Sequence, residues 1–166
     1  MTMKIGQVIT GPAVFCAFVL LVPAAHAQQS VDITYCFSLA TTAVSDSDEM
    51  RITSFDFKGI ARSNTDNTLL DNLTFHGVGV GRIESGKTHN FGYIKFMDAD
   101  GDWMVTENLR TLEDQEAGNW RFLHGTGKWK GIEGGGKLLR LTRGRPIMPN
   151  TSQGCIRMTG TYRLPK

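Results

Sequence analysis

Residues 31–39 read Val-Asp-Ile-Thr-Tyr-Cys-Phe-Ser-Leu, with an apolar side chain at every odd position and a polar residue or cysteine at every even one. Alternation with a period of two puts these two sets of side chains on opposite faces of a β-strand. The stretch therefore predicts a half-buried strand that carries Cys36 on its polar face.

Seven further runs with strand-like alternation follow, separated by turn-rich segments such as residues 45–48 and 84–86. Helical periodicity is scarce along the chain. We expect these further strands at residues 50–62, 73–84, 87–98, 102–111, 119–124, 137–143 and 154–164. Eight antiparallel strands in one small domain predict an all-β fold, either a closed barrel or a sandwich.

The first 27 residues have the composition of a secretory signal peptide. Lys4 supplies a positive charge, residues 13–22 form an apolar run, and Ala25-His26-Ala27 is a small-residue cleavage site. The apolar run is too short to span a bilayer. We therefore expect residues 1–27 to be removed and residues 28–166 to form one β-barrel domain, periplasmic or secreted, without a membrane anchor.

The net charge of the mature chain argues against two classes of partner. Removing Lys4 from the 18 basic residues leaves 17 against 16 acidic ones, so the net charge is about +1. A nearly neutral chain gives no electrostatic reason to bind nucleic acid or an anionic membrane. Nothing in the strands fixes a face for a second copy, so a homo-oligomer stays open.

Two cysteines, Cys36 and Cys155, remain after cleavage in an oxidising compartment. A disulfide is predicted over two free thiols or a metal pair, because no Cys or His spacing nearby suits a metal. Both cysteines belong to polar strand faces, and a bridge requires nearby β-carbons. The first and last strands are then neighbours, which favours a closed barrel, although a sandwich with paired terminal strands has the same geometry.

Residues 125–136 hold six glycines around Trp129 and resemble a nucleotide-binding loop. A P-loop requires glycine where Phe122 stands and a hydroxyl residue where Trp129 stands. The spacing also lacks the βαβ context of a dinucleotide fingerprint. We interpret the segment as a glycine-rich connection before the closing strands, with Trp129 buried and Lys128 and Lys130 beside it in solvent.

The segment Asp98-Ala99-Asp100-Gly101-Asp102 puts three carboxylates into five residues. Its glycine comes one place too early for an EF-hand calcium loop. An Asp-Gly hairpin is the preferred interpretation, since glycine tolerates the positive φ of a tight turn. A weak cation site at the tip is the alternative, and no metal site is predicted elsewhere.

The order of strand, 98–102 hairpin, strand, glycine-rich segment 125–134 and closing strands resembles the allene oxide cyclase and dirigent type of barrel. This calycin-like fold also occurs in small secreted bacterial proteins, and the resemblance covers about the C-terminal two-thirds of the mature chain. It implies an eight-stranded barrel with an apolar cavity. No catalytic residue of that family is carried over, because none aligns with a position of this sequence.

The aromatic residues of the expected inward faces suggest a function inside the barrel. They are Tyr35, Phe37, Phe55, Phe57, Trp103, Trp120 and Phe122. The first hypothesis is a module that binds a hydrophobic small molecule through these residues without a cofactor. The alternatives are a cofactor-free cyclase or isomerase of the allene oxide cyclase type, and a structural barrel whose core is filled.

Three polar residues interrupt the expected apolar faces and are the candidate catalytic residues: Arg51, Glu107 and His124. If those faces line the cavity, a guanidinium, a carboxylate and an imidazole lie in apolar surroundings, which shift pKa values toward acid–base use. All three are also near strand ends. A solvated rim or an internal salt bridge is the preferred interpretation there.

Overall fold

The computed structural model describes residues 27–111 and 117–165. The predicted signal peptide therefore lies, except for Ala27, outside the described residues. Among the residues that are described, no helix is both long enough and apolar enough to cross a membrane.

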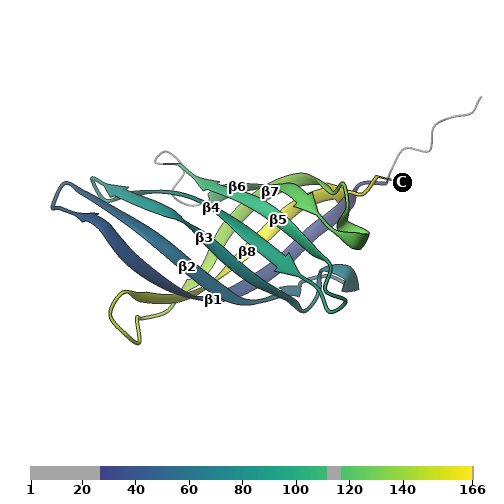
Figure 1. Ribbon diagram of the computed structural model, residues 1–166, viewed down its shortest axis with the longest axis horizontal. Coiled ribbons are helices and arrows are strands. Elements are labelled where there is room, and N and C mark those ends of the chain that lie inside the picture. Colours follow the sequence, from purple (N-terminus) through teal and green to yellow (C-terminus); the bar gives the residue numbers. More distant parts are fainter. Residues whose placement is uncertain (1–26, 112–116, 166) are drawn as a thin grey trace, which may run out of the picture.

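Eight antiparallel strands form a closed barrel in which each strand pairs with its neighbours in sequence (Figure 1). The strands are β1 (Gln29–Asp46), β2 (Met50–Ser63), β3 (Leu73–Glu84), β4 (Lys87–Met97), β5 (Trp103–Arg110), β6 (Ala117–Gly125), β7 (Glu133–Arg143) and β8 (Thr151–Arg163). Two short 3-10 turns, η1 (Thr68–Leu70) and η2 (Gly127–Trp129), lie in the connections. The prediction of an eight-stranded antiparallel barrel is confirmed.

The connections divide the barrel into two different ends (Figure 1). One end, which we call the closed end, carries both described chain ends, the β4–β5 turn and the connections that contain η1 and η2. Leu70, Trp129 and Ile132 are buried there, at 1%, 0% and 3% exposure. The opposite end, which we call the open end, carries the β1–β2, β3–β4 and β7–β8 turns. Among the described residues, apolar side chains of these connections thus fill the closed end of the barrel.

The alternation predicted for residues 31–39 is present in the burial of β1. Val31, Ile33 and Tyr35 are almost fully buried, whereas Cys36 is exposed. The remaining core follows the same rule on the other strands and includes Phe57, Phe75, Ile94, Phe96, Trp120, Phe122, Met158 and Tyr162. The hydrophobic effect on these inward faces therefore holds the sheet in its closed form.

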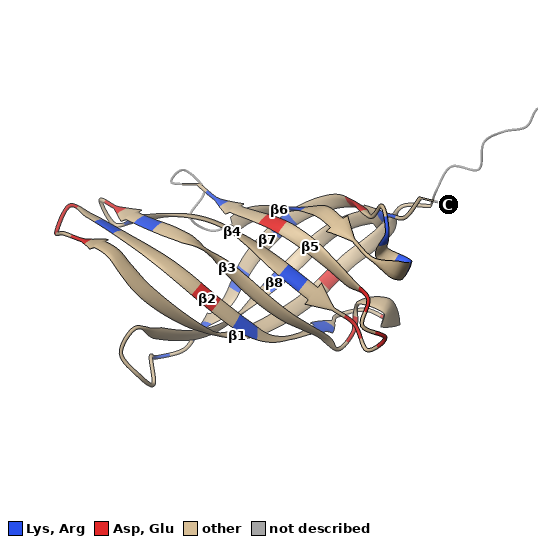
Figure 2. Ribbon diagram, in the orientation of Figure 1, with Lys and Arg blue, Asp and Glu red and all other residues tan. Residues whose placement is uncertain are grey.

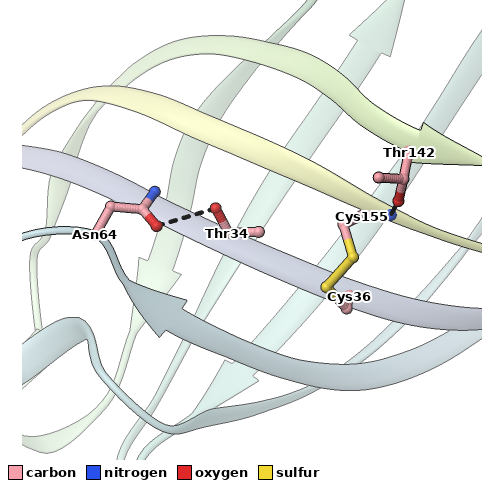
Figure 3. Close-up of a disulfide and its surroundings, with 5 residues drawn as sticks. All are labelled: Thr34, Cys36, Asn64, Thr142 and Cys155. Carbon is pink, nitrogen blue, oxygen red and sulfur yellow. Dashed lines mark hydrogen bonds between the residues drawn. A yellow bond between two sulfur atoms is a disulfide. The ribbon is translucent and has the colours of Figure 1, made fainter.

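A disulfide joins Cys36 of β1 to Cys155 of β8 and confirms the predicted bridge (Figure 3). The two residues are directly opposite in the register, with their Cα atoms 4.1 Å apart. The amide of Cys155 also donates a 3.0 Å hydrogen bond to the hydroxyl of Thr142 on β7. The seam between the first and last strands is thus closed both by the sheet ladder and by a covalent bond.

The glycine-rich segment is only partly a connection, and the expected start of the seventh strand at residue 137 is wrong. β7 begins at Glu133, and Gly135 and Gly136 pair with Arg121 and Trp120 of β6. A Cβ at Gly136 would lie 1.9 Å from the backbone oxygen of Thr159. Glycine is required here because backbone groups of β8 approach more closely than any side chain allows.

Candidate ligand-binding cavity

A cavity of about 130 Å³ lies in the half of the barrel nearer the open end. Ligand pockets for drug-sized molecules usually measure roughly 300–1,000 Å³, so this interior holds about one ring or a short chain. A larger molecule has to extend beyond it toward the open end. The residues that line the cavity come from seven strands: Tyr35, Phe37, Leu39, Phe55, Phe57, Asn90, Phe91, Gly92, Asn108, Leu109, Arg110, Gly118, Leu138, Arg140 and Ile156.

The walls of the cavity are mainly apolar, and part of that apolar surface stays accessible. Phe37, Leu39, Phe55 and Ile156 are only half-buried, although they pack against the core. Leaving apolar side chains in contact with water costs about 25 cal/mol per Å² of exposed area. Binding of a hydrophobic ligand that covers these side chains would therefore be favoured by the hydrophobic effect.

Glycines of β3 make room for the two phenylalanine rings of this wall. A Cβ at Gly77 would lie 2.4 Å from the ring of Phe57, and one at Gly79 would lie 2.5 Å from the ring of Phe55. The rings of Phe55 and Phe57 are tilted against each other at 5.9 Å between centroids. The glycines of β3 therefore determine the positions of the Phe55 and Phe57 rings, because larger residues at Gly77 and Gly79 would displace both rings.

Tyr35 brings a hydroxyl group into this apolar space. The residue is only 2% exposed, and its hydroxyl makes no hydrogen bond to any other described residue. Burial raises the pKa of Tyr35 far above its usual value, against the opposing effect of the positive charges of Arg110 and Arg140. Tyr35 consequently remains a neutral phenol that can donate a hydrogen bond into the cavity.

Arg110 of β5 and Arg140 of β7 are the two charged residues that line the cavity. Neither forms an ion pair with another residue in the described ranges 27–111 and 117–165. The partial burial of the Arg140 guanidinium lowers its pKa, and the nearby charge of Arg110 lowers it further. Two cations thus share an apolar site in which the described part of the chain supplies no balancing carboxylate.

Asn90 and Asn108 complete the polar lining. The Asn108 side-chain oxygen is buried and accepts no hydrogen bond within the described structure. A buried acceptor without a donor costs about 1–3 kcal/mol. Asn108 therefore offers an acceptor that a hydroxyl of a guest, or water, can satisfy.

The aromatic residues that the sequence assigned to ligand binding divide into three groups. Tyr35, Phe37, Phe55 and Phe57 line the cavity. Trp120 and Phe122 are buried in the core, where the indole of Trp120 donates a 3.0 Å hydrogen bond to the backbone oxygen of Thr159. Trp103 lies on the outer surface, with Lys95 over its ring at 4.9 Å and the ring of the exposed His124 at 5.4 Å.

The expected inward faces of β5 and of the end of β6 are wrong. Met104 and Thr106 are the buried residues of β5, and the register shifts between Val105 and Thr106. On β6 this bulge leaves both Leu123 and His124 exposed. A bulge adds one residue to a strand and so reverses the alternation beyond it, which period-two reasoning does not detect.

The structure does not bring the three candidate catalytic residues together. Glu107 accepts a 2.8 Å hydrogen bond from Arg121 on the outer surface, and His124 is exposed beside Trp103. Arg51 lies at the open end, where its Nε atom is 3.6 Å from a carboxylate oxygen of Asp46. None of the three lines the cavity, and their catalytic role stays a prediction.

The charged cavity residues that sequence reasoning missed are Arg110 and Arg140. Both lie inside strands that were expected, at residues 102–111 and 137–143, and Arg140 shares its alternation with the buried Leu138. Arg110 was missed because the inward face of β5 was assigned to the odd positions. A search for arginines on either face of each predicted strand would have found both.

At the closed end, the acidic turn and the glycine-rich connection form one hydrogen-bonded unit, and acidic residues are visible at the β4–β5 turn in Figure 2. The Asp102 carboxylate accepts a 3.0 Å hydrogen bond from the amide of Lys128, and Asp100 pairs with the Lys128 ammonium at 2.6 Å. Trp129 is fully buried, and Lys128 and Lys130 are exposed, as predicted. The Asp102 carboxylate thus occupies the amide end of η2 to which an external anion would bind.

No group of three or more His, Cys, Asp or Glu side chains in the described ranges is arranged to hold a metal ion. The sequence matches no family model and has no significant match among curated proteins. Among solved structures the fold is similar to that of the pterocarpan synthase dirigent protein GePTS1, with a TM-score of 0.50 at 9% sequence identity. The similarity covers 85% of this chain and 94% of that one, and it identifies the fold as a dirigent-like β-barrel.

Proposed function

We propose that this protein binds a hydrophobic small molecule in the barrel, with the molecule entering through the open end. The observation that carries the proposal is the cavity that Phe37, Phe55 and Ile156 line while they remain half-buried. A barrel that only needed a filled core would cover these side chains, as it covers Trp129 at the closed end. The disulfide is typical of oxidising compartments, and we place the function in the periplasm or outside the cell.

The test compares two tryptophan substitutions on neighbouring strands. Ile156→Trp fills the cavity, whereas Leu139→Trp adds the same ring to the outer face, where Leu139 is 46% exposed. Isothermal titration with 4-phenyl-1-butanol and 1-decanol, two neutral probes, measures binding to each variant. We expect Ile156→Trp to weaken binding at least tenfold and Leu139→Trp to leave it within twofold.

Equal affinity in the two variants would place binding outside the barrel and overturn the proposal. Because Ile156→Trp introduces a large residue, its urea unfolding curve is recorded, and Leu39→Trp nearer the open end serves as a second cavity-filling variant. Native mass spectrometry of protein purified from its own host then identifies any retained molecule. A retained molecule that Ile156→Trp does not displace counts against the cavity.

One observation favours the alternative of a cofactor-free cyclase or isomerase. The buried hydroxyl of Tyr35 and the two guanidinium groups share the cavity, and such donors can stabilise negative charge that develops in a transition state. The fold similarity to a dirigent protein is compatible with this activity but gives no residue for it. A Tyr35→Phe variant that keeps its affinity and loses turnover would establish the enzyme; unchanged turnover would remove Tyr35 from the mechanism.

A further inference from the structure

We propose that the molecule bound in the cavity is an amphipathic carboxylic acid, whose ionised head is held between Arg110 and Arg140 and whose apolar chain or ring lies against the phenylalanine wall. This inference rests on the proposed function and specifies its ligand class. The geometry that carries it is the position of both guanidinium groups in the lining of one apolar cavity.

Most of the other arginines are paired on the outer surface. Arg62, Arg121, Arg157 and Arg163 each make an ion pair with an aspartate or glutamate there. Arg110 and Arg140 have no such partner among the described residues, and they differ from the likewise unpaired Arg143 and Arg145 because they line the cavity. Arg110 is half-buried, and Arg140 is partly desolvated at the cavity although it is exposed as a residue. Partial desolvation disfavours each unpaired charge, and the two guanidinium groups also repel each other. A bound anion relieves both effects.

The shape of the guanidinium selects the head group. Its planar set of N–H donors matches the two oxygens of a carboxylate, and it stays charged at any physiological pH. Tyr35 of β1 adds a neutral hydroxyl donor. Tyr35 is the register partner of Ile156 on β8, and Ile156 is in turn the register partner of Arg140 on β7. Donors from three strands therefore line the same cavity.

The apolar part of the ligand follows from the remaining lining. Phe37, Leu39 and Phe55 are apolar residues of the same lining. The interior volume of about 130 Å³ fits one ring or a short chain, and the rest of a longer molecule extends to the open end. An aryl-alkanoic acid and a medium-chain fatty acid share these requirements, so both are used in the test.

The test uses matched acids and alcohols: 4-phenylbutyrate with 4-phenyl-1-butanol, and decanoate with 1-decanol. We expect the wild-type protein to bind at least one acid ten times more tightly than its alcohol. Arg110→Gln and Arg140→Gln should each weaken binding of that acid about tenfold and leave the alcohol within twofold. Tighter binding of 4-phenylbutyrate would indicate an aryl-alkanoic acid as the ligand, and tighter binding of decanoate would indicate a fatty acid.

Arg163→Gln is the matched control, because it removes the same charge at the closed end, from a pair with Glu133. Arg163→Gln should change neither the affinity for the acid nor the affinity for the alcohol. Equal binding of acids and alcohols, or equal loss in all three variants, would overturn the anion site and leave the proposed function standing. Failure of both alcohols and both acids to bind would overturn both. Urea unfolding of each variant confirms that it is folded.

Discussion

The indole nitrogen of Trp129 donates a 2.7 Å hydrogen bond to a carboxylate oxygen of Asp98, across 31 residues of sequence. The Asp98 side chain is 7% exposed and also lies 3.2 Å from the ammonium of Lys128. Burial by itself would raise the pKa of Asp98, but the hydrogen bonds from Trp129 and Lys128 outweigh it and lower the pKa below its usual value. The buried tryptophan is thus held in place by an ionised carboxylate.

Replacing Asp98 should destabilise the barrel according to what the new side chain offers the indole. Asp98→Ala leaves the Trp129 N–H buried without an acceptor, and we expect a loss of about 1.5–3 kcal/mol in the free energy of unfolding. Asp98→Asn keeps an acceptor and should lose less. Urea unfolding at pH 7, followed by tryptophan fluorescence, measures both variants; equal losses would show that only the charge matters.

The same carboxylate should contribute to acid sensitivity. Its pKa is lower in the folded than in the unfolded state, so its stabilisation is complete above the unfolded value of about 3.9 and is lost as the pH falls through the folded pKa. Asp98→Asn should therefore flatten the decline of stability below about pH 4. A decline as steep as in the wild type would assign the acid sensitivity to Asp32 and Asp71, whose pKa values are also lowered.

Two glycine substitutions separate backbone strain from loss of a contact. Gly127 and Gly101 both have positive φ, of 48° and 87°. A Cβ at Gly127 would lie 1.9 Å from the Asp102 carboxylate, whereas one at Gly101 would have nothing within 4 Å. We expect Gly101→Ala to cost about 1 kcal/mol through strain alone and Gly127→Ala to cost clearly more. Equal costs in thermal unfolding would mean that Asp102 moves aside freely.

Removing the disulfide should lower stability without changing the fold. The bridge closes a loop with a sequence separation of 119 residues, and loop closure of this length is worth at most about 4–5 kcal/mol. We expect the double variant Cys36→Ser, Cys155→Ser to lose about 2–4 kcal/mol in urea and to keep its far-ultraviolet circular dichroism. Wild type in reducing buffer should match it; a stable, unaffected double variant would show that the ladder between β1 and β8 suffices.

The two cavity arginines should reduce the stability of the empty protein. Burial and the charge of Arg110 both disfavour the charged form of Arg140, so Arg140→Gln should not lower the urea midpoint of unliganded protein. It should also reduce the stabilisation that added salt gives, because salt screens the repulsion between the two guanidinium groups. Arg163→Gln, which breaks the exposed pair with Glu133, is the control and should not reduce the stabilisation that added salt gives.

Glu107→Gln, His124→Ala and Arg51→Gln should each leave the affinity for 4-phenyl-1-butanol within twofold. Glu107 is paired with Arg121 and His124 is exposed, so neither reaches the cavity. Titration of the three variants against wild type measures this. A tenfold loss in any of them would mean that the ligand lies outside the cavity described above.

The sequence predicted the barrel well because burial of one face of a strand appears in the sequence as alternation of apolar and polar residues. Alternation in β1 and the position of Cys36 and Cys155 on polar faces determined both the strand and its neighbour. The cavity could be predicted only in part. Tyr35, Phe37, Phe55 and Phe57 were found from alternation, but the bulge on β6 opposite Val105 and Thr106 reversed the face of His124. Glu107 was misassigned because the apolar odd positions of β5 were taken as the inward face, whereas Met104 and Thr106 are the buried ones.

Other features depend on contacts that no local pattern encodes. The hydrogen bond from Trp129 to Asp98 joins two motifs that were interpreted separately, one as a connection and one as a hairpin. Gly134–Gly136 were interpreted as part of a connection because glycine has low strand propensity, yet close approach of the β6 and β8 backbones makes glycine necessary there. Tertiary packing, rather than propensity, decided these positions.

The bridge between Cys36 and Cys155 also changes what a break in the backbone can do. The chain between the two cysteines and the disulfide together form a closed covalent ring that includes β2 to β7. A protease that cuts once inside this ring, in the β3–β4 turn for example, releases no fragment, and the two pieces separate on a gel only after reduction. The barrel can therefore be nicked and still keep all of its strands in one molecule.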